Sequence, residues 1–329
     1  MRRRQFLVLL GNAVVSWPLA AHAQQTEHSR RIGVLMAFAE GDSLTQEYIS
    51  SFRRGLSDAG WVEGRNLRIE YRWNVVDAVK AKTYAAELSQ LQLDAILAVG
   101  GASTTALRAL NGTMPVVFVL ITDPIAQGFV QSLARPGGNM TGFTTLELTI
   151  GGKWLEVLRE LQPGLSRVSV IFASEVNSYA DLLIKPMQAM ETSTKMVIVP
   201  APIRNESDID AIIREMHRES DAFVVLQDAY TVAKRRMIID RGNQAGICGI
   251  FPTPLFVRDG GLISYGPDLS DQFARAASYI DRILRGAPAG DLPVQQPVKF
   301  KLVINLKTAK ALGFAIPETL QIAADEVIE

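Results

Sequence analysis

The residues best placed to do chemistry come directly after apolar runs. Residues 94–110, DAILAVGGASTTALRAL, pass from an apolar stretch through two glycines to Ser103, Thr104 and Thr105, and then into helical spacing. A helix that begins in this way has free backbone N–H groups at its start, and these suit a small anion such as a carboxylate. The turn predicts either a carboxylate site or ordinary helix capping by Ser103.

Two aspartates stand at equivalent places later in the chain. Asp123 follows the apolar run 115–121 and precedes a proline, and Asp228 follows the run 222–226. Each carboxylate could cap a helix, or it could accept a hydrogen bond from a ligand ammonium or hydroxyl group. Both alternatives stay open at this point. If the two acids and the anion-binding turn share a cleft, they suit a zwitterion, of which an amino acid is the simplest case.

Other kinds of chemistry lack their residues. The sequence has no G-x-G-x-x-G after its first apolar run, no GKS or GKT, no G-x-S-x-G and no H-E-x-x-H. Cys248 is the single cysteine, and beyond the leader the histidines are His28 and His217. We therefore expect no cofactor, no metal and no enzymatic activity. Lysine plus arginine equals aspartate plus glutamate at 34 each, so we expect no nucleic-acid partner.

Alternating apolar and amphipathic segments must position these turns. Strands are predicted at 31–38, 67–73, 95–99 and 115–121, and a second array begins with a helix at 152–161 and a strand at 167–173. Continuous apolar runs are typical of parallel sheets that are covered on both faces. Two such arrays in succession predict two doubly wound, Rossmann-like α/β lobes, with seams at 134–152 and 288–297.

The N-terminus reads as an export signal. MRRRQ is basic, FLVLLGNAVV is apolar, and Ala21-His22-Ala23 resembles a cleavage site. Arg3 and Arg4 allow a twin-arginine signal, and an ordinary secretory signal is the alternative. We expect residues 1–23 to be removed and the protein to be periplasmic, with no lipid anchor because no cysteine stands at the cleavage site.

Several long, ordered segments resemble one known family. They are RRIGVLMAFAE, FRRGLSDAGWVEGRNLRIEYRW, the TDP of LITDPIAQGFVQSLARPGGNMTGFT, GGKWLEVLRE, GGLISYGPDLSDQFARAASYIDRILRG and LPVQQPVKFKLVINLKTAKALG. In these segments the chain is similar to ABC-transporter substrate-binding proteins of the tryptophan-binding type. The resemblance implies the type I periplasmic-binding-protein fold, in which three crossovers join two lobes. Lobe one would comprise 30–145 plus 250–290, and lobe two 146–249 plus 291–329.

The resemblance also implies ligand contacts at several strand ends. With Tyr179 added as an aromatic wall, the expected ligand-binding residues are Gly101, Ala102, Ser103, Thr104, Thr122, Asp123, Ser174, Asn177, Tyr179 and Asp228. Ala173 and Gln227 depart from the family pattern, which often has asparagine and proline at those positions. Both departures lie in lobe two and concern the part of the wall that would meet the ligand side chain.

The expected function is capture of an amino-acid-like solute and its delivery to ABC permease transmembrane subunits. We expect the receptor to be a monomer that closes its lobes around the ligand. A periplasmic sensor that passes the ligand signal to a receptor is one alternative. An exported α/β enzyme is another, and Ser103, Asp123 or Asp228 would then have to supply its nucleophile or base.

Overall fold

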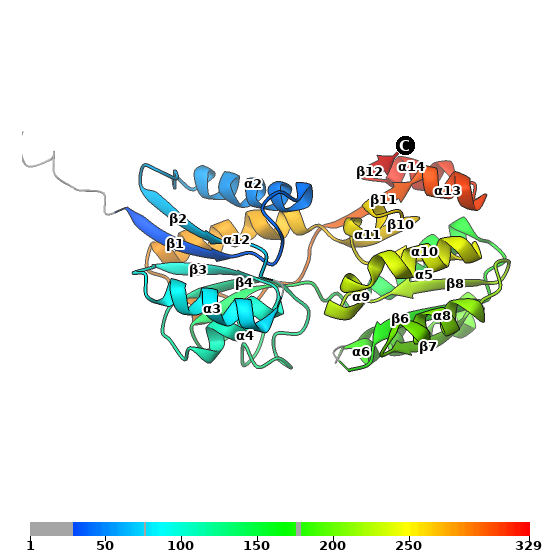
Figure 1. Cartoon of the computed structure of the whole chain (residues 1–329), viewed down its shortest axis with the longest axis horizontal. Helices are drawn as coiled ribbons and strands as arrows, with labels where there is room; N and C mark the ends of the chain where they lie inside the picture. The colour runs from blue at the N-terminus through cyan, green and yellow to red at the C-terminus, as the bar shows by residue number, and fades with distance from the viewer. Residues whose placement is uncertain (1–28, 76, 176–178) are drawn as a thin grey trace, which may run out of the picture.

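The alternating apolar runs and amphipathic helices form two sheets in two lobes that lie side by side (Figure 1). The structure is a computed structural model, and it describes residues 29–75, 77–175 and 179–329. Every neighbouring pair of strands is parallel except one antiparallel pair, β10 and β11. The two doubly wound α/β lobes expected from the sequence are thus confirmed.

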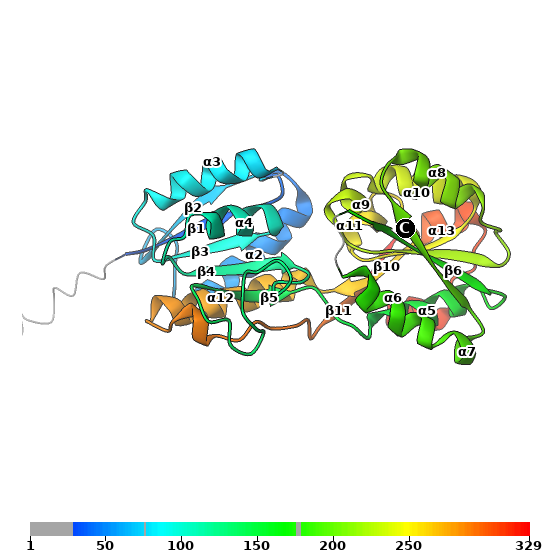
Figure 2. The same cartoon turned by 90° about the horizontal axis from the view of Figure 1, so that it is seen from below.

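Lobe one is a five-stranded sheet in the order β2-β1-β3-β4-β5. Two helices cover each face, α2 and α12 on one and α3 and α4 on the other, as Figures 1 and 2 show. The strands are β1 (Arg30–Leu35), β2 (Leu67–Arg72), β3 (Ala95–Val99), β4 (Val116–Ile121) and β5 (Met140–Thr144). The helices are α2 (Ser43–Asp58), α3 (Ala78–Ser89), α4 (Gly101–Ala109) and α12 (Leu269–Leu284).

Lobe two is a seven-stranded sheet in the order β12-β11-β10-β9-β8-β6-β7. Helices α5, α6 and α13 pack on one face, and α8, α10 and α11 pack on the other. The strands are β6 (Arg167–Ala173), β7 (Val197–Ile203), β8 (Asp221–Val225), β9 (Cys248–Phe251), β10 (Ile263–Pro267), β11 (Phe300–Asn305) and β12 (Glu326–Ile328). The helices are α5 (Ile150–Leu161), α6 (Ala180–Ala189), α7 (Glu191–Thr194), α8 (Glu206–Arg214), α9 (Ala229–Ala233), α10 (Arg235–Ala245), α11 (Pro254–Arg258), α13 (Leu306–Leu312) and α14 (Glu318–Ala323).

The lobe boundaries differ from the expected ones at 250 and 290. Strands β9 and β10 belong to the sheet of lobe two, so the chain re-enters lobe one with α12, after residue 267. Leu292 and Val294 still pack in the cores of lobe one, so the final return comes after them. The expected boundary at 250 is wrong because β9 continues the parallel array of β8 rather than opening a crossover.

Three crossovers join the lobes, and hydrogen bonds tie them together at the end of lobe one. The first crossover follows β5, the second follows β10, and the third follows residue 295. Thr144 N donates to Gln295 O, and Gln295 N donates to Gly142 O, each at 3.0 Å. The Gln272 amide of α12 donates to Thr144 O at 3.0 Å. The second and third crossovers meet where Asp268 N donates to Lys299 O at 2.9 Å.

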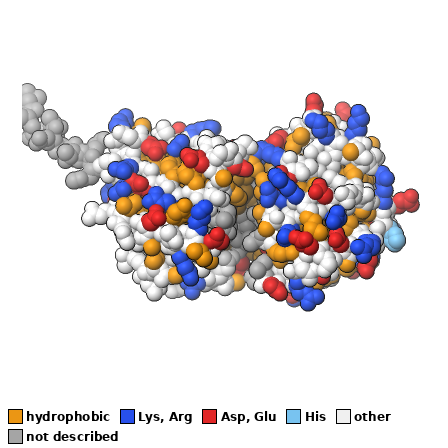
Figure 3. All heavy atoms as spheres, viewed as in Figure 1, with side chains coloured by type: hydrophobic (Ala, Val, Ile, Leu, Met, Phe, Trp, Pro, Cys, Tyr) orange, Lys and Arg blue, Asp and Glu red, His pale blue; other side chains and the backbone are white. Residues whose placement is uncertain are grey.

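The predicted export signal at 1–23 lies outside the described residues. Across residues 29–75, 77–175 and 179–329, no helix has both the length and the apolar character needed to cross a membrane. Figure 3 shows basic and acidic side chains interspersed over the visible face of both lobes.

Candidate functional site

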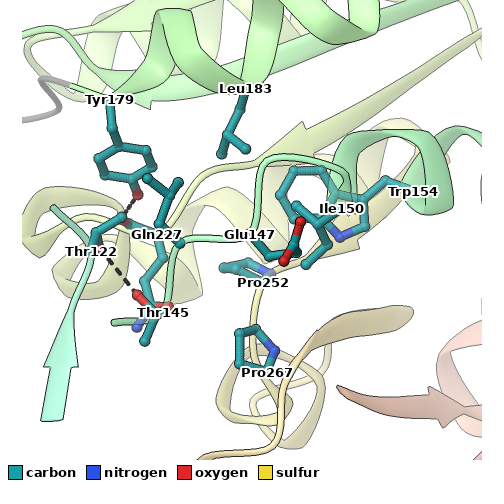
Figure 4. A pocket seen from close by; sticks show the side chains of 11 residues that line it. Thr122, Thr145, Glu147, Ile150, Trp154, Tyr179, Leu183, Gln227, Pro252 and Pro267 are labelled. Atoms are coloured by element: carbon teal, nitrogen blue, oxygen red, sulfur yellow. Dashed lines mark hydrogen bonds between the residues drawn. The ribbon is translucent and has the colours of Figure 1, made fainter. Parts of the chain in front are cut away.

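A small cavity, partly open to solvent, lies between the lobes where the crossovers pass (Figure 4). Both lobes and two of the crossover regions contribute to its walls. The lining residues are Thr122, Thr145, Leu146, Glu147, Ile150, Trp154, Tyr179, Leu183, Gln227, Pro252 and Pro267. The walls are mainly apolar, with a few hydroxyl, amide and carboxylate groups, as is common in small-molecule sites.

A backbone irregularity shapes the wall that lobe one supplies. The register between β4 and β5 shifts between Phe118 and Ile121, and Leu120 takes the left-handed φ of 60°. A bulge of this kind changes the direction of the chain that follows it. Beyond it, the Thr122 and Thr145 hydroxyls lie 3.3 Å apart at the edge of the cavity.

Side-chain contacts shape the wall that lobe two supplies. Tyr179, which is 6% exposed, donates its hydroxyl to Gln227 O. This bond holds Tyr179, the N-cap of α6, against the end of β8, and Figure 4 shows the Tyr179 ring over Thr122 and Gln227. Of the ten expected ligand residues, Thr122 and Tyr179 line the cavity.

Both aspartates cap the backbone, as one of the two alternatives predicted. Asp123 Oδ1 accepts from Ile125 N at 3.1 Å and from Ala126 N at 2.9 Å. Asp228 Oδ1 accepts from Thr231 N at 2.8 Å in a capping box, and its Oδ2 accepts from Ala173 N at 2.9 Å. Neither carboxylate is among the groups that line the cavity.

The Gly-Gly-Ala-Ser-Thr-Thr turn begins α4 without a side-chain cap. Gly100 is the N-cap at a left-handed φ of 83°, so the predicted capping by Ser103 is wrong. The Thr104 hydroxyl donates back to Gly100 O at 2.9 Å, whereas the fully buried Ser103 hydroxyl has no hydrogen-bond partner among the described residues. Gly101 and Ala102 are half-buried. None of the four expected ligand residues in this turn, 101–104, lines the cavity.

The remaining expected contacts lie in the turn after β6. Ser174 is exposed and does not line the cavity, and Asn177 lies outside the described residues. Of Ala173 and Gln227, the two departures from the family pattern, Gln227 lines the cavity and Ala173 does not. Ala173 supplies the N–H that Asp228 accepts, and the Gln227 side chain lines the cavity.

Sequence reasoning missed the residues that line the base of the cavity. Glu147, Ile150, Trp154 and Pro267 come from the crossovers and from the start of α5 rather than from strand-end turns. Trp154 is 3% exposed and donates its indole N–H to Tyr265 O at 2.7 Å, so its ring presents an apolar surface to the cavity. The predicted crossover segment 134–152 could have pointed to Glu147 and Ile150, whereas Trp154 and Pro267 lie outside it.

An ion cluster joins the lobes outside the cavity. Glu47 of α2 lies 3.5 Å from the Arg258 guanidinium of α11 and 3.6 Å from the Lys301 ammonium of β11. Ser270 Oγ donates to Glu47 at 2.7 Å. Burial raises the pKa of Glu47, but the Ser270 hydrogen bond and the two cations outweigh it, so the pKa is lowered overall. The ionised form of Glu47 therefore helps to hold the lobes together.

Within the described part of the chain, no group of three or more histidine, cysteine, aspartate or glutamate side chains could hold a metal ion. The cavity brings together aromatic rings, aliphatic side chains, two threonine hydroxyls and one carboxylate. Mainly apolar walls with a few polar groups are typical of sites for small organic molecules.

Comparison with known proteins gives relatives along almost the whole described chain. The family model of ABC transporter substrate binding proteins matches residues 31–328. A tyrosine-binding protein from Clostridioides difficile (strain R20291) is 27% identical over 262 residues, which cover 79% of this chain and 75% of that protein.

Solved structures share the fold. An ABC domain from Streptococcus pneumonia in complex with L-Trp superposes with a TM-score of 0.77 at 24% identity, covering 91% of this chain and 100% of that one. A ligand-free, open substrate binding protein with adhesive properties from Clostridium difficile gives a TM-score of 0.74 at 19% identity, covering 91% and 99% of the two chains. With two lobes, three crossovers and a cavity between them, this chain belongs to the family of ABC transporter substrate binding proteins.

Proposed function

We propose that this protein is the extracytoplasmic receptor of an ABC importer and that it captures a free amino acid between its lobes. The observation that carries the proposal is the cavity at the crossovers, which has apolar walls and a small set of polar groups. The tyrosine-binding relative and the neighbour with bound L-Trp support an aromatic amino acid as the solute.

The apolar lining provides a place for the ligand side chain. In Figure 4 Leu183 lies above the cavity, Ile150 and Trp154 lie to the right, and Pro252 and Pro267 lie below. Burying an aromatic or large aliphatic side chain contributes about 1.5–3 kcal/mol. A micromolar complex requires about −8 kcal/mol, so polar contacts must supply much of the rest.

The ligand carboxylate would be held by lobe one. The first-turn N–H groups of α4 lack intrahelical acceptors, as at every helix start, and the helix dipole favours an anion there. Ser103 adds a buried hydroxyl without a partner among the described residues. In the proposed closed form, α4 and the Thr122 hydroxyl face the ligand together. Thr122 already lines the cavity, whereas lobe closure must bring α4 to the ligand.

Residues 1–23 would direct export, and the mature monomer would work outside the cytoplasm. Closure of the lobes would then create the surface that the permease subunits recognise. The solute leaves unchanged, because the proposed role is binding and transfer rather than turnover.

Calorimetry of the mature protein with L-tyrosine, L-tryptophan, L-phenylalanine, L-leucine and myo-inositol tests the proposal. We expect micromolar or tighter binding of at least one aromatic amino acid and no binding of myo-inositol. A ligand at 100 times its dissociation constant should also stabilise the fold by about 2.7 kcal/mol, which raises the melting temperature. Binding of myo-inositol without any amino acid would overturn the proposal.

A further inference from the structure

Among the described residues that line the cavity, Glu147 has the one acidic or basic side chain. It lies on the crossover between β5 and α5, and in Figure 4 its side chain lies between Pro252 and Ile150. The two aspartates selected from the sequence have their carboxylates engaged by backbone N–H groups outside the cavity lining. The negative charge of the cavity therefore comes from the crossover rather than from either strand-end acid.

The carboxylate of Glu147 is held in place at one oxygen. Oε1 accepts from Thr149 N at 3.0 Å and from the Thr149 hydroxyl at 2.9 Å. Across the described residues, Oε2 accepts no hydrogen bond, and no lysine, arginine or histidine forms an ion pair with Glu147. Glu147 thus has a fixed position and one oxygen available to a ligand.

An unpaired carboxylate in an apolar cavity becomes costly when water is removed. Ile150 and Pro252 flank the half-buried Glu147 side chain, and lobe closure would bury it further. A buried charge is stable only when it is paired and hydrogen-bonded. A ligand that carries a cation at this point would supply the missing partner, whereas a ligand without one would leave the charge uncompensated.

We infer that Glu147 accepts the ammonium group of the bound amino acid and makes the site selective for ligands that carry a cation there. The inference rests on the proposed function, since it assigns one end of the proposed amino-acid ligand. It also places the ammonium group of the ligand against the crossover that carries Glu147, which is one of the segments that join the two lobes. A charge-assisted hydrogen bond of this kind corresponds to roughly a 10- to 150-fold change in affinity.

Glu147→Gln tests the inference, with Glu219→Gln as the matched control. Glutamine retains an oxygen that can accept both Thr149 bonds, so the change removes charge without removing the contact that fixes the side chain. Glu219 is exposed, lies in the turn before β8 and does not line the cavity. Unchanged melting temperatures of both variants would show that the fold is intact.

The probes are L-tyrosine and L-leucine with their deaminated counterparts, 3-(4-hydroxyphenyl)propionate and 4-methylpentanoate. By calorimetry, we expect Glu147→Gln to bind the amino acid at least tenfold more weakly than the wild type. We expect Glu219→Gln to bind it with the wild-type affinity. We also expect the preference for the amino acid over its deaminated counterpart to fall by the same factor, because the counterpart has no ammonium group.

Two results would overturn the inference, and they differ from failure of the proposed function. If wild type and Glu147→Gln bind the amino acid equally, Glu147 is not the ammonium acceptor. If the variant loses the same factor of affinity for the amino acid and for its deaminated counterpart, Glu147 only positions the crossover. If the wild-type protein binds no amino acid at all, the proposed function fails first and the inference fails with it.

Discussion

The two walls of the cavity are built in different ways. In lobe one, the path of the backbone sets the wall, through the bulge at Leu120 and the close approach of Gly142 to β4. In lobe two, side chains set it, through the Tyr179 bond to Gln227 and the Asp228 bonds that link the ends of β6 and β8. A wall fixed by backbone tolerates little change, whereas a wall fixed by side chains can be altered one contact at a time.

One of the two departures from the family pattern, Gln227, lies in the wall that side chains set, whereas Ala173 meets Asp228 only through its backbone N–H. This agrees with the comparison, since a substitution there changes a contact without displacing a strand. Lobe one would then provide a constant platform for the part of the ligand that all amino acids share. We expect substitutions in lobe two, rather than in lobe one, to change the ligand preference of this protein.

The largest loss of stability is expected from Gly142→Ala in lobe one. A Cβ at Gly142 would lie 2.0 Å from Phe118 O and 2.7 Å from Phe118 N, and the φ of 154° also disfavours a side chain. The backbone would have to move, so we expect a loss of at least about 3 kcal/mol in the free energy of unfolding. Urea denaturation measures this loss.

Gly138→Ala is the matched control in the same lobe, because a Cβ there meets no atom within 4 Å. We expect its unfolding midpoint to stay close to that of the wild type. A Gly142→Ala protein as stable as Gly138→Ala would show that the backbone of lobe one is more adaptable than the comparison holds.

The second-largest loss of stability is expected from Asp228→Ala in lobe two. This change removes the α9 cap and leaves the buried Ala173 N–H without its acceptor, so we expect a loss of about 2–4 kcal/mol. Asp123→Ala in lobe one removes only a local cap and should cost about 1 kcal/mol. Thermal unfolding of the two variants side by side tests the order, and equal losses would contradict the linking role of Asp228.

A smaller effect is expected from Tyr179→Phe. The ring remains in place and the donor to Gln227 O is lost, so stability should fall by about 0.5–1.5 kcal/mol. Because this bond joins two segments of the cavity wall, ligand affinity should change as well, as calorimetry would show. Unchanged affinity would mean that the ring alone shapes this side of the cavity.

The smallest loss of stability is expected from Glu47→Gln in the ion cluster, which belongs to neither wall. The pKa of Glu47 is lowered from its ordinary value of 4.5, so its contribution to stability is present above that value and is lost as the pH falls through the folded-state pKa. Because the side chain is about one third exposed, the contribution is at most about 1 kcal/mol. Wild type should be slightly more stable than Glu47→Gln at pH 7, and this difference should disappear in acid. A difference that persists in acid would exclude the charge as its cause.

Much of the fold could be predicted because long apolar runs leave few alternatives to a covered parallel sheet. β6 begins and ends where the sequence places it, and the alternation of strands and helices gives the two lobes. β5 was missed because Met140–Thr144, MTGFT, contains a glycine and two threonines and has no apolar run. The boundary at 250 failed because no local pattern distinguishes a strand that extends one sheet from a strand that enters another.

The site was harder to predict than the fold. Strand ends were the right region for Thr122 and Tyr179, but the functions of Asp123 and Asp228 depend on backbone groups whose positions only the folded chain reveals. Glu147 and Trp154 lie on segments that looked like connections, and their shared cavity forms only when the crossovers meet. Single-sequence patterns do not encode such contacts between distant segments.

The pairing of β10 with β11 has a mechanical consequence for the joint. Pro267 pairs with Phe300 at the ends of these strands, and Asp268 N bonds to Lys299 O just beyond, so two of the three connections leave lobe two as a two-stranded ribbon. A ribbon flexes easily across its face but resists bending in its own plane, since that would stretch its hydrogen bonds. We therefore expect any movement of the lobes to bend this paired connection across its face rather than within its plane.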